Sequence, residues 1–314
     1  MVERIADDLI DAIASPIVEN GTHLVVTTSI GMSRYNPDED SVDALMRQAD
    51  IAMYSAKKQG RNRYCWFDDI MEKELQTRNW LETEMRAGIP KGEFVPYYEQ
   101  QVDLATGKLT GFEMLCRWES RTQGLISPEV FIPIAEETGM IDELSLSVLR
   151  QSFEDAKDWD PGLTISVNIS PIQLLDPWLA QKIVKLLVES GFPANRLEIE
   201  ITESSLFENL SLAQSIVRSL KNQGIKIALD DFGTGYSSLA HLRALPFDQI
   251  KIDRSFVTSI IQNPESQAIV KAITGLGESL GMKITAEGID SKEAESELRR
   301  IGCAKGQGWY YGRP

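Results

Sequence analysis

Oxygen-bearing side chains recur at the ends of predicted strands, and their types suit the binding of hard metal ions. They are Glu113, Asn168, Glu200, Asp230, Asp231 and Glu287. Carboxylate and amide oxygens are the ligands that magnesium and manganese prefer. Only two histidines, His23 and His241, occur in the chain, so a multi-histidine metal site has little to draw on. The sequence therefore predicts carboxylate-based metal chemistry.

Six such groups offer enough ligands for two divalent cations. A pair of cations about 3.5 to 4 Å apart can activate water and stabilise both oxygens of an in-line phosphoryl displacement. Lys251, in Gln-Ile-Lys-Ile-Asp253, is a positive group that could orient that water. A single strand-end carboxylate is more often a solvated loop residue or a helix cap. Recurrence on successive strands makes that alternative weak.

The paired aspartates also fit a second, compatible role. Asp230 and Asp231 precede Phe-Gly-Thr-Gly, in which Gly233 and Gly235 permit positive φ. This pattern predicts a tight turn at the end of a strand, with an aspartate as its cap. A turn residue can still be a metal ligand.

Alternating strands and helices must position these groups. From about Phe94 onward, strands are predicted at Gly111–Trp118, Leu163–Ile169, Leu197–Thr202, Lys226–Asp230, Gln249–Ile252 and Lys283–Ala286. Helices are predicted between them, for example over Trp178–Glu189 and Leu212–Gln223. Repeated βα units favour a (β/α)8 barrel, in which the strand ends meet at one mouth, although an open doubly wound sheet has the same local pattern.

The first part of the chain follows a different pattern. An apolar helix around Ile5–Ile13 precedes a strand over His23–Gly31, a helix opened by Asp38–Ser41, and a strand over Arg63–Phe67. A charged, periodic stretch then predicts a linking helix. We expect three parts: an α/β module over 1–69, a linker helix over 70–87 and a barrel domain over 88–314.

Composition limits the partners that we expect. Thirty-two basic residues against 47 acidic ones give a formal charge of -15, which disfavours a polymeric nucleic acid or an anionic membrane surface as a partner. Cys65, Cys116 and Cys303 lie far apart and fit reduced thiols. With no long apolar run or secretory leader, we expect a cytoplasmic protein, or the cytoplasmic part of a larger membrane-associated sensor.

The ordered motifs resemble those of EAL-domain cyclic di-GMP phosphodiesterases, over about Asp68 to Pro314. The matching segments are Glu113-Met114-Leu115 with Arg117-Trp118, Ser-Val-Asn168, Glu200-Ile-Thr-Glu203, Asp230-Asp231-Phe-Gly-Thr-Gly-Tyr-Ser-Ser-Leu239, Lys251-Ile-Asp253, Ala-Glu287-Gly and Gly306-Gln307-Gly308. The resemblance implies an α/β fold, a TIM-like barrel with one antiparallel strand. It also implies hydrolysis of cyclic di-GMP to linear 5′-pGpG with two magnesium or manganese ions, and a homodimer.

The resemblance also implies roles for individual residues. Lys251 would position the nucleophilic water, Glu203 would hold the loop from Asp231 to Leu239, Arg117 would contact a substrate phosphate, and Gln307 would assist at the site. The metal ligands would be Glu113, Asn168, Glu200, Asp230, Asp231 and Glu287. A receptor that binds cyclic di-GMP without cutting it is the main alternative, and a pure scaffold is a weaker one.

The N-terminal module resembles the final part of a GGDEF diguanylate cyclase domain. The resemblance rests on Ser-Ile-Gly31, Ala-Asp50-Ile-Ala-Met-Tyr54-Ser-Ala-Lys-Lys58 and Gly60-Arg-Asn-Arg63. The Gly-Gly-Asp-Glu-Phe signature is absent from the sequence, and the resemblance places it upstream of Met1. We therefore expect a partial domain without cyclase activity.

Three positions depart from the EAL pattern. Met114 replaces the alanine of the name-giving tripeptide, Glu99 replaces the glutamine of an early Tyr-Gln-Pro, and Asp290 stands where a second glutamate often follows. A negative Glu99 is expected to weaken the binding of an anionic nucleotide. Arg243 is read as a surface residue, and the aromatic side chains of Trp309 to Tyr311 as part of the barrel wall rather than as base-stacking groups.

Overall fold

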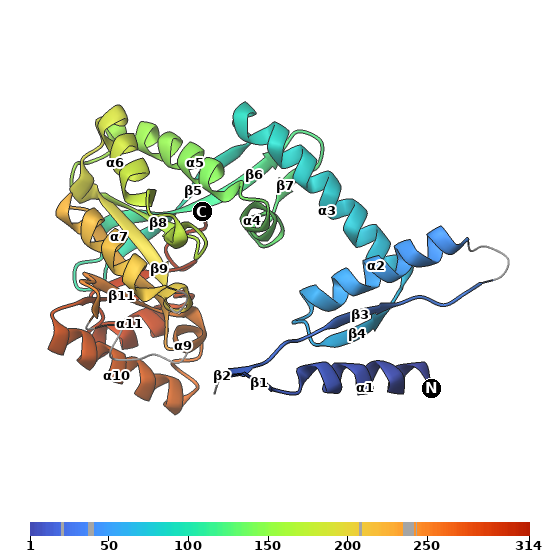
Figure 1. Ribbon diagram of the computed structural model, residues 1–314. Helices are drawn as coiled ribbons and strands as arrows, with labels where there is room; N and C mark the ends of the chain where they lie inside the picture. The colour runs from blue at the N-terminus through green and yellow to red at the C-terminus, as the bar shows by residue number, and fades with distance from the viewer. Residues whose placement is uncertain (20–21, 37–40, 207–208, 235–241, 243) are drawn as a thin grey trace. The chain divides into compact units, whose positions relative to one another are not determined.

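The computed structural model describes residues 1–314 except 20–21, 37–40, 207–208, 235–241 and 243 (Figure 1). The chain divides into two compact units, Met1–Glu84 and Met85–Pro314. In the described part of the chain, no helix combines the length and the apolar character of a membrane-spanning segment.

The first unit is a small α/β module. Its elements, the last of which runs on into the second unit, are α1 (Val2–Ala14), β1 (Ile17–Glu19), β2 (Thr22–Leu24), β3 (Ser29–Met32), α2 (Val42–Lys58), β4 (Arg63–Trp66) and α3 (Asp69–Gly88). The prediction of a single strand over His23–Gly31 is wrong. The segment forms parts of two strands that belong to different sheets, since β2 pairs with β1 and β3 pairs in parallel with β4.

Close packing of α2 on β3 explains one glycine of this module. A Cβ at Gly31 would lie 1.8 Å from the carbonyl oxygen of Ala49 in α2, so no other residue fits this approach. Helix α2 begins after Ser41, whose side chain accepts a hydrogen bond from the backbone N–H of Ala44. Residues 37–40 lie outside the described residues, so the predicted acidic opening of this helix is described only from Ser41.

The second unit is a closed barrel. Within the described residues its strands are β5 (Phe94–Asp103), β6 (Leu109–Ser120), β8 (Thr164–Ile169), β9 (Leu197–Thr202), β10 (Lys226–Phe232), β11 (Gln249–Ile252), β12 (Lys283–Ala286) and β13 (Lys305–Gln307). Their order is β5-β13-β12-β11-β10-β9-β8-β6, and β6 pairs back with β5 to close the ring. Strand β5 is antiparallel to both neighbours, whereas the other pairs around the ring are parallel. This confirms the barrel with one antiparallel strand and excludes the open sheet.

Helices of the second unit follow most of the strands. They are α4 (Pro128–Glu137), α5 (Ile141–Asp155), α6 (Leu179–Ser190), α7 (Leu210–Asn222), α9 (Arg254–Thr258), α10 (Pro264–Leu280) and α11 (Lys292–Ile301), with short turns of 3₁₀ helix at Ile89–Lys91, Ala156–Asp158, Gln173–Leu175, Ala194–Arg196 and Glu203–Leu206 and a short strand β7 (Gly124–Ile126) beside β6. Local signals set their ends: Asn263 caps α10 and Gly281 ends it in the left-handed conformation. Helices α6 and α7 confirm the two helices predicted from periodicity.

Strand β9 shows how the barrel presents polar groups to its interior. Leu197, Ile199 and Ile201 are fully buried, whereas the alternate residues Glu198 and Glu200 contact polar side chains of other barrel strands. Because side chains alternate along a strand, one face of β9 packs in an apolar layer and the other faces the barrel interior. Barrel interiors are usually filled with bulky branched residues, so this polar filling marks a functional interior.

Candidate active site

Lys251 lies at the centre of a carboxylate cluster inside the barrel. Its side chain is completely buried, and Nζ lies 2.5 Å from an oxygen of Glu200 and 2.5 Å from an oxygen of Glu287. Longer contacts of 3.4 Å reach Glu113 and Asp230. These carboxylates come from β6, β9, β10 and the residue that follows β12. The structure therefore brings together groups that lie up to 174 residues apart in the sequence, from Glu113 to Glu287.

Two amides hold Glu113 in place. Asn168 donates from Nδ2 to Oε1 of Glu113 at 2.6 Å, and Gln307 donates from Nε2 to the other carboxylate oxygen. Glu113 is only 6% exposed. Because the amide nitrogen of Asn168 faces Glu113, its carbonyl oxygen is left available as a ligand.

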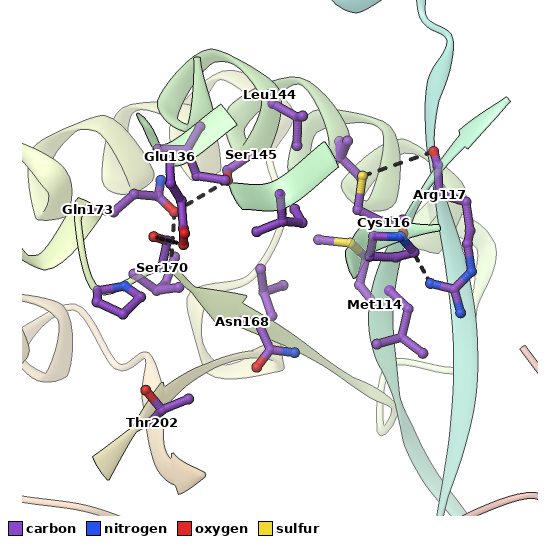
Figure 2. A pocket seen from close by; sticks show the side chains of 18 residues that line it. Met114, Cys116, Arg117, Glu136, Leu144, Ser145, Asn168, Ser170, Gln173 and Thr202 are labelled. Atoms are coloured by element: carbon purple, nitrogen blue, oxygen red, sulfur yellow. Dashed lines mark hydrogen bonds between the residues drawn. The ribbon is translucent and has the colours of Figure 1, made fainter. Parts of the chain in front are cut away.

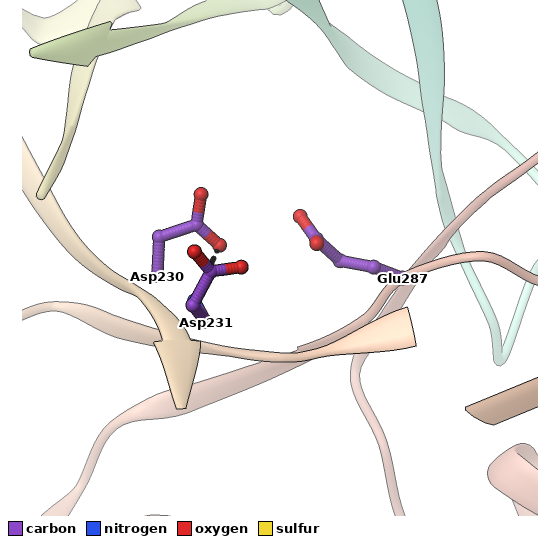
Figure 3. A group of neighbouring side chains, drawn as sticks. All are labelled: Asp230, Asp231 and Glu287. Carbon is purple, nitrogen blue, oxygen red and sulfur yellow. Dashed lines mark hydrogen bonds between the residues drawn. The ribbon is translucent and has the colours of Figure 1, made fainter. Parts of the chain in front are cut away.

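Asp230, Asp231 and Glu287 point toward one another from two strand ends (Figure 3). One carboxylate oxygen from each lies within 4.8 Å of the others. The backbone bends sharply here: Asp231 has φ of 54° and its N–H donates to Oδ1 of Asp230 at 2.8 Å. Gly233 follows with φ of 102°, so the predicted turn is present, and it directs consecutive carboxylates into one cluster.

Burial and mutual repulsion control the charges of the cluster. Burial raises the pKa of Glu200 well above its usual range, and the charge of Glu113 raises it further. Burial also raises the pKa of Glu287 well above its usual range, although Lys251 opposes the effect. Burial alone would lower the pKa of Lys251, but the surrounding carboxylates, Asp230 first, raise it well above its usual range. Lys251 is therefore charged at neutral pH.

The donor set fits divalent cations. One ammonium group cannot neutralise the four carboxylates that contact it, and uncompensated buried charge is costly. Oε1 of Glu200 is buried and has no hydrogen-bond partner among the described residues, as expected for an oxygen that is suited to bind a cation. The ligands available are oxygens, which suit hard cations. The residues that could hold such ions are Glu113, Asn168, Glu200, Asp230, Asp231 and Glu287.

A cavity of about 310 Å³ opens beside this cluster. Glu113, Asp230 and Glu287 line it together with Glu99 and Trp309. The expectation that Trp309 is buried in the barrel wall is wrong, because its side chain is 63% exposed. The position of Trp309 directly after Gly306-Gln307-Gly308 was the sequence signal that could have placed it at the cavity.

The two acidic departures from the family pattern also line this cavity. Glu99 faces Glu113 across the β5–β6 pair, and Asp290 is exposed at the cavity. Burial raises the pKa of Glu99, while a hydrogen bond from Gln307 lowers it. Both side chains therefore lie where a bound anion would meet them.

A second cavity, of about 290 Å³, is mostly apolar (Figure 2). Asn168 and Arg117 border it, so it adjoins the carboxylate cluster on another side. Glu136 gives it a polar wall, since its Oε1 accepts a hydrogen bond from the Ser170 hydroxyl at 2.6 Å. Arg117 donates to the carbonyl of Cys116 and its guanidinium lies 5.6 Å from the ring centroid of Tyr97.

Glu203 is buried at the start of the 3₁₀ turn that follows β9. The loop that it is predicted to hold begins at Asp231, but residues 235–241 lie outside the described residues. Arg243 also lies outside the described residues, so its surface position stays a prediction.

Comparison with protein families gives two matches. The EAL domain matches residues 82–314. The diguanylate cyclase GGDEF domain matches residues 1–63.

Similar curated proteins are signalling proteins and cyclic di-GMP enzymes. An uncharacterised signalling protein of Caulobacter vibrioides is 43% identical over 99% of this chain and 38% of its own length. The bifunctional diguanylate cyclase/cyclic di-GMP phosphodiesterase MucR of Pseudomonas aeruginosa is 35% identical over 99% of this chain and 46% of its own length. The cyclic di-GMP phosphodiesterase PdeR of Escherichia coli is 33% identical over 100% of this chain and 48% of its own length. The chain thus spans less than half of each relative.

A solved structure shares the fold. The MucR phosphodiesterase in complex with cyclic di-GMP has a TM-score of 0.70 and 34% sequence identity, over 75% of this chain and 97% of that one.

Proposed function

The chain belongs to the EAL-domain family, and from this premise we propose that it is a cyclic di-GMP-specific phosphodiesterase. It would hydrolyse one phosphodiester bond of cyclic di-GMP to give linear 5′-pGpG. Relatives named as cyclic di-GMP phosphodiesterases support the proposal. The observation that carries it is the buried Lys251 surrounded by Glu113, Glu200, Asp230 and Glu287.

Two Mg²⁺ or Mn²⁺ ions, bound in the cluster, would supply Lewis acidity and lower the pKa of a bound water. The chain's own residues would do the positioning. Lys251 would orient the attacking water and stabilise developing negative charge, because it is charged and shielded from solvent. Glu113, fixed at both oxygens, would present a rigid ligand. Glu203 would order the loop that carries Asp231.

The two cavities suit a ligand with two planar bases and central phosphates. Asn168 borders one cavity, whereas Glu113, Asp230 and Glu287 border the other, so a phosphate at the cluster leaves room for a base on either side. Arg117 would contact a phosphate as a cation. Trp309 would offer an exposed indole face to a base.

A receptor that binds cyclic di-GMP without hydrolysing it is the second candidate. The intact set of carboxylates around Lys251 disfavours it, because binding alone does not need a buried lysine among ligands for cations.

We also propose the division into 1–69, 70–87 and 88–314, assembly as a homodimer, no contact with a membrane by this chain, and no cyclase activity of the N-terminal module.

The decisive experiment incubates the purified protein with cyclic di-GMP and Mg²⁺ or Mn²⁺ and separates the nucleotides by chromatography. Wild type should release linear pGpG, whereas Glu113→Ala and Lys251→Ala should not. Glu265→Ala, at the exposed start of α10, is the matched control and should behave as wild type. Saturable binding with intact substrate would instead establish the receptor.

A further inference from the structure

A buried glutamine lies one step behind the carboxylate cluster. Gln101 is completely buried on β5, directly opposite Gln307 in the antiparallel β5–β13 pair. Its Nε2 donates to Oε1 of Gln307 at 3.3 Å and to the Ser166 hydroxyl at 3.2 Å. Gln101 thus connects three barrel strands, β5, β13 and β8, below the site.

The partners of Gln307 decide which way its amide faces. Its Nε2 donates to Oε2 of Glu99 at 2.6 Å and to Oε2 of Glu113. Ionised carboxylates only accept hydrogen bonds, so the NH₂ group must face them and the carbonyl oxygen must face away. On that far side, the NH₂ of Gln101 meets the Gln307 oxygen. A donor at position 101 therefore stabilises the orientation in which Gln307 clamps two carboxylates.

The clamp joins groups that would otherwise repel each other. Glu99 and Glu113 face each other across the β5–β6 pair. Burial raises the pKa of Glu99, and the negative charge of Glu113 raises it further. A shared NH₂ group places partial positive charge between them. With the amide reversed, a carbonyl oxygen would face both carboxylates, and Glu113 would lose a bond that fixes its direction.

One atom shows that packing alone does not explain Gln101. Its Oε1 is buried and, within the part of the chain that the structure describes, has no hydrogen-bond partner. Such an unpaired oxygen destabilises the fold relative to an apolar side chain of the same shape. Methionine would fill the same space without an unpaired oxygen. The amide is useful here for its donor.

We propose that Gln101 is a positioning residue: it orients the Gln307 amide, which fixes Glu113 for cation binding and hydrolysis. This inference rests on the proposed function, because the proposed hydrolysis requires the carboxylate cluster to bind cations. Two substitutions of similar size to glutamine separate a positioning role from a packing role, because they differ in the hydrogen bonds that they can form. Gln101→Met removes the donor, and Gln101→Glu puts an acceptor in its place.

The test is calorimetric titration of the metal-free proteins with Mn²⁺, alongside kcat and KM for cyclic di-GMP. Gln101→Met should weaken Mn²⁺ binding roughly tenfold, the lower end for a partner that orients a ligand, and lower kcat more than it changes KM. Mn²⁺ binding by Gln101→Glu should be weaker still, although glutamate resembles glutamine more closely in shape than methionine does. A merely structural role changes the stability of the variants and leaves their Mn²⁺ affinity equal to that of wild type, because a buried glutamate at position 101 is destabilising in either case.

Gln249→Met is the matched control. Gln249 is also a buried barrel glutamine, 2% exposed, but its amide donates to Glu198 rather than to the cluster. It should lose stability and keep the Mn²⁺ affinity of wild type. Equal affinities in wild type and both Gln101 variants would overturn the proposal, as would an equal loss in Gln249→Met.

Failure of the two proposals can be told apart. Wild type that binds Mn²⁺ without cutting cyclic di-GMP overturns the phosphodiesterase and leaves the Gln101 titrations decisive, whereas wild type that binds no Mn²⁺ overturns both. If neither Gln101 variant folds, the side-chain amide resonances of Gln307 in wild type carry the test. Slow exchange of both N–H protons supports the clamp, and fast exchange overturns it.

Discussion

The side chains of Lys251 and Glu200 meet at 2.5 Å although neither is exposed to solvent. A buried ion pair of this kind needs further partners to offset desolvation. Lys251 finds them in Glu113, Asp230 and Glu287. The lysine therefore offsets the negative charge of the cluster and also supplies positive charge where hydrolysis is proposed to occur.

Replacing this lysine should separate its two roles. Lys251→Met is expected to lower kcat about 10²- to 10³-fold, the usual effect of removing one preorganised charge or donor. It should also destabilise the metal-free protein by ~3 to 5 kcal/mol, because the buried carboxylates lose their counter-charge. Turnover assays and urea unfolding measure the two effects. Lys283→Met, at an exposed position, is the control. Turnover of Lys251→Met within twofold of wild type would contradict the role of Lys251 in hydrolysis.

Stabilisation by Mg²⁺ should grow with pH. Folded-state pKa values of Glu200, Glu287 and Asp231 lie above their usual values, chiefly through burial. Their contribution to stability is therefore present at low pH and is lost as pH rises through the folded pKa values. Glu113 has the opposite sign: burial would raise its pKa, but Lys251 and hydrogen bonds lower it. The three raised groups should outweigh it.

Protons and cations compete for the same oxygens, so Mg²⁺ should restore the stability that deprotonation removes. The measurement compares Tm in chelator and in Mg²⁺ between about pH 5 and pH 8. The Tm gain should increase across this range in wild type. A gain that is constant with pH, or absent, would contradict cation binding by these carboxylates.

Trp309 should contribute to substrate binding rather than to chemistry. Trp309→Ala is expected to raise KM about fivefold or more, or ~1 kcal/mol at the lower end for base stacking, with kcat nearly unchanged. Trp178→Ala is a close control, because both indoles are 63% exposed and only Trp309 lines the cavity beside the cluster. Equal KM values for the two variants would remove Trp309 from the site.

Glu99→Gln should tighten substrate binding. The change removes a negative charge from the cavity, and a glutamine oxygen can still accept the bond from Gln307. We expect KM to fall up to about fivefold, ~1 kcal/mol for a partly screened charge. Steady-state kinetics at two ionic strengths would show the difference shrinking with salt. A higher KM would indicate that Glu99 assists binding.

The sequence predicted the parallel strands and the groups at their ends for one physical reason. Parallel strands deliver residues near their carboxyl ends to one mouth, and Asn168, Glu200, Asp230 and Glu287 follow that rule. Strand β5 runs the other way, so its carboxyl end does not point to the mouth, and Glu99 and Gln101 lie within the strand. Gln101 could not be recognised from position alone, and Glu99 stood out only as a departure from the family pattern.

Other features escaped prediction because they depend on tertiary context. Strand β13 is only three residues long and contains Gly306, so it carries little strand signal of its own. It forms because β5 and β12 lie on either side of it. The exposure of Trp309 likewise follows from where the chain leaves this short strand, which hydrophobicity does not reveal.

Closure of the ring through β5 has a consequence for biosynthesis. Gln101 and Gln307 are 206 residues apart in the chain, and at the usual rate of translation this distance corresponds to roughly 10 to 40 s. Until Gln307 has left the ribosome, Glu113 lacks one of its amide partners and β5 lacks a neighbour. The nascent polypeptide therefore cannot complete the carboxylate cluster around Glu113 before residue 307 has been synthesised.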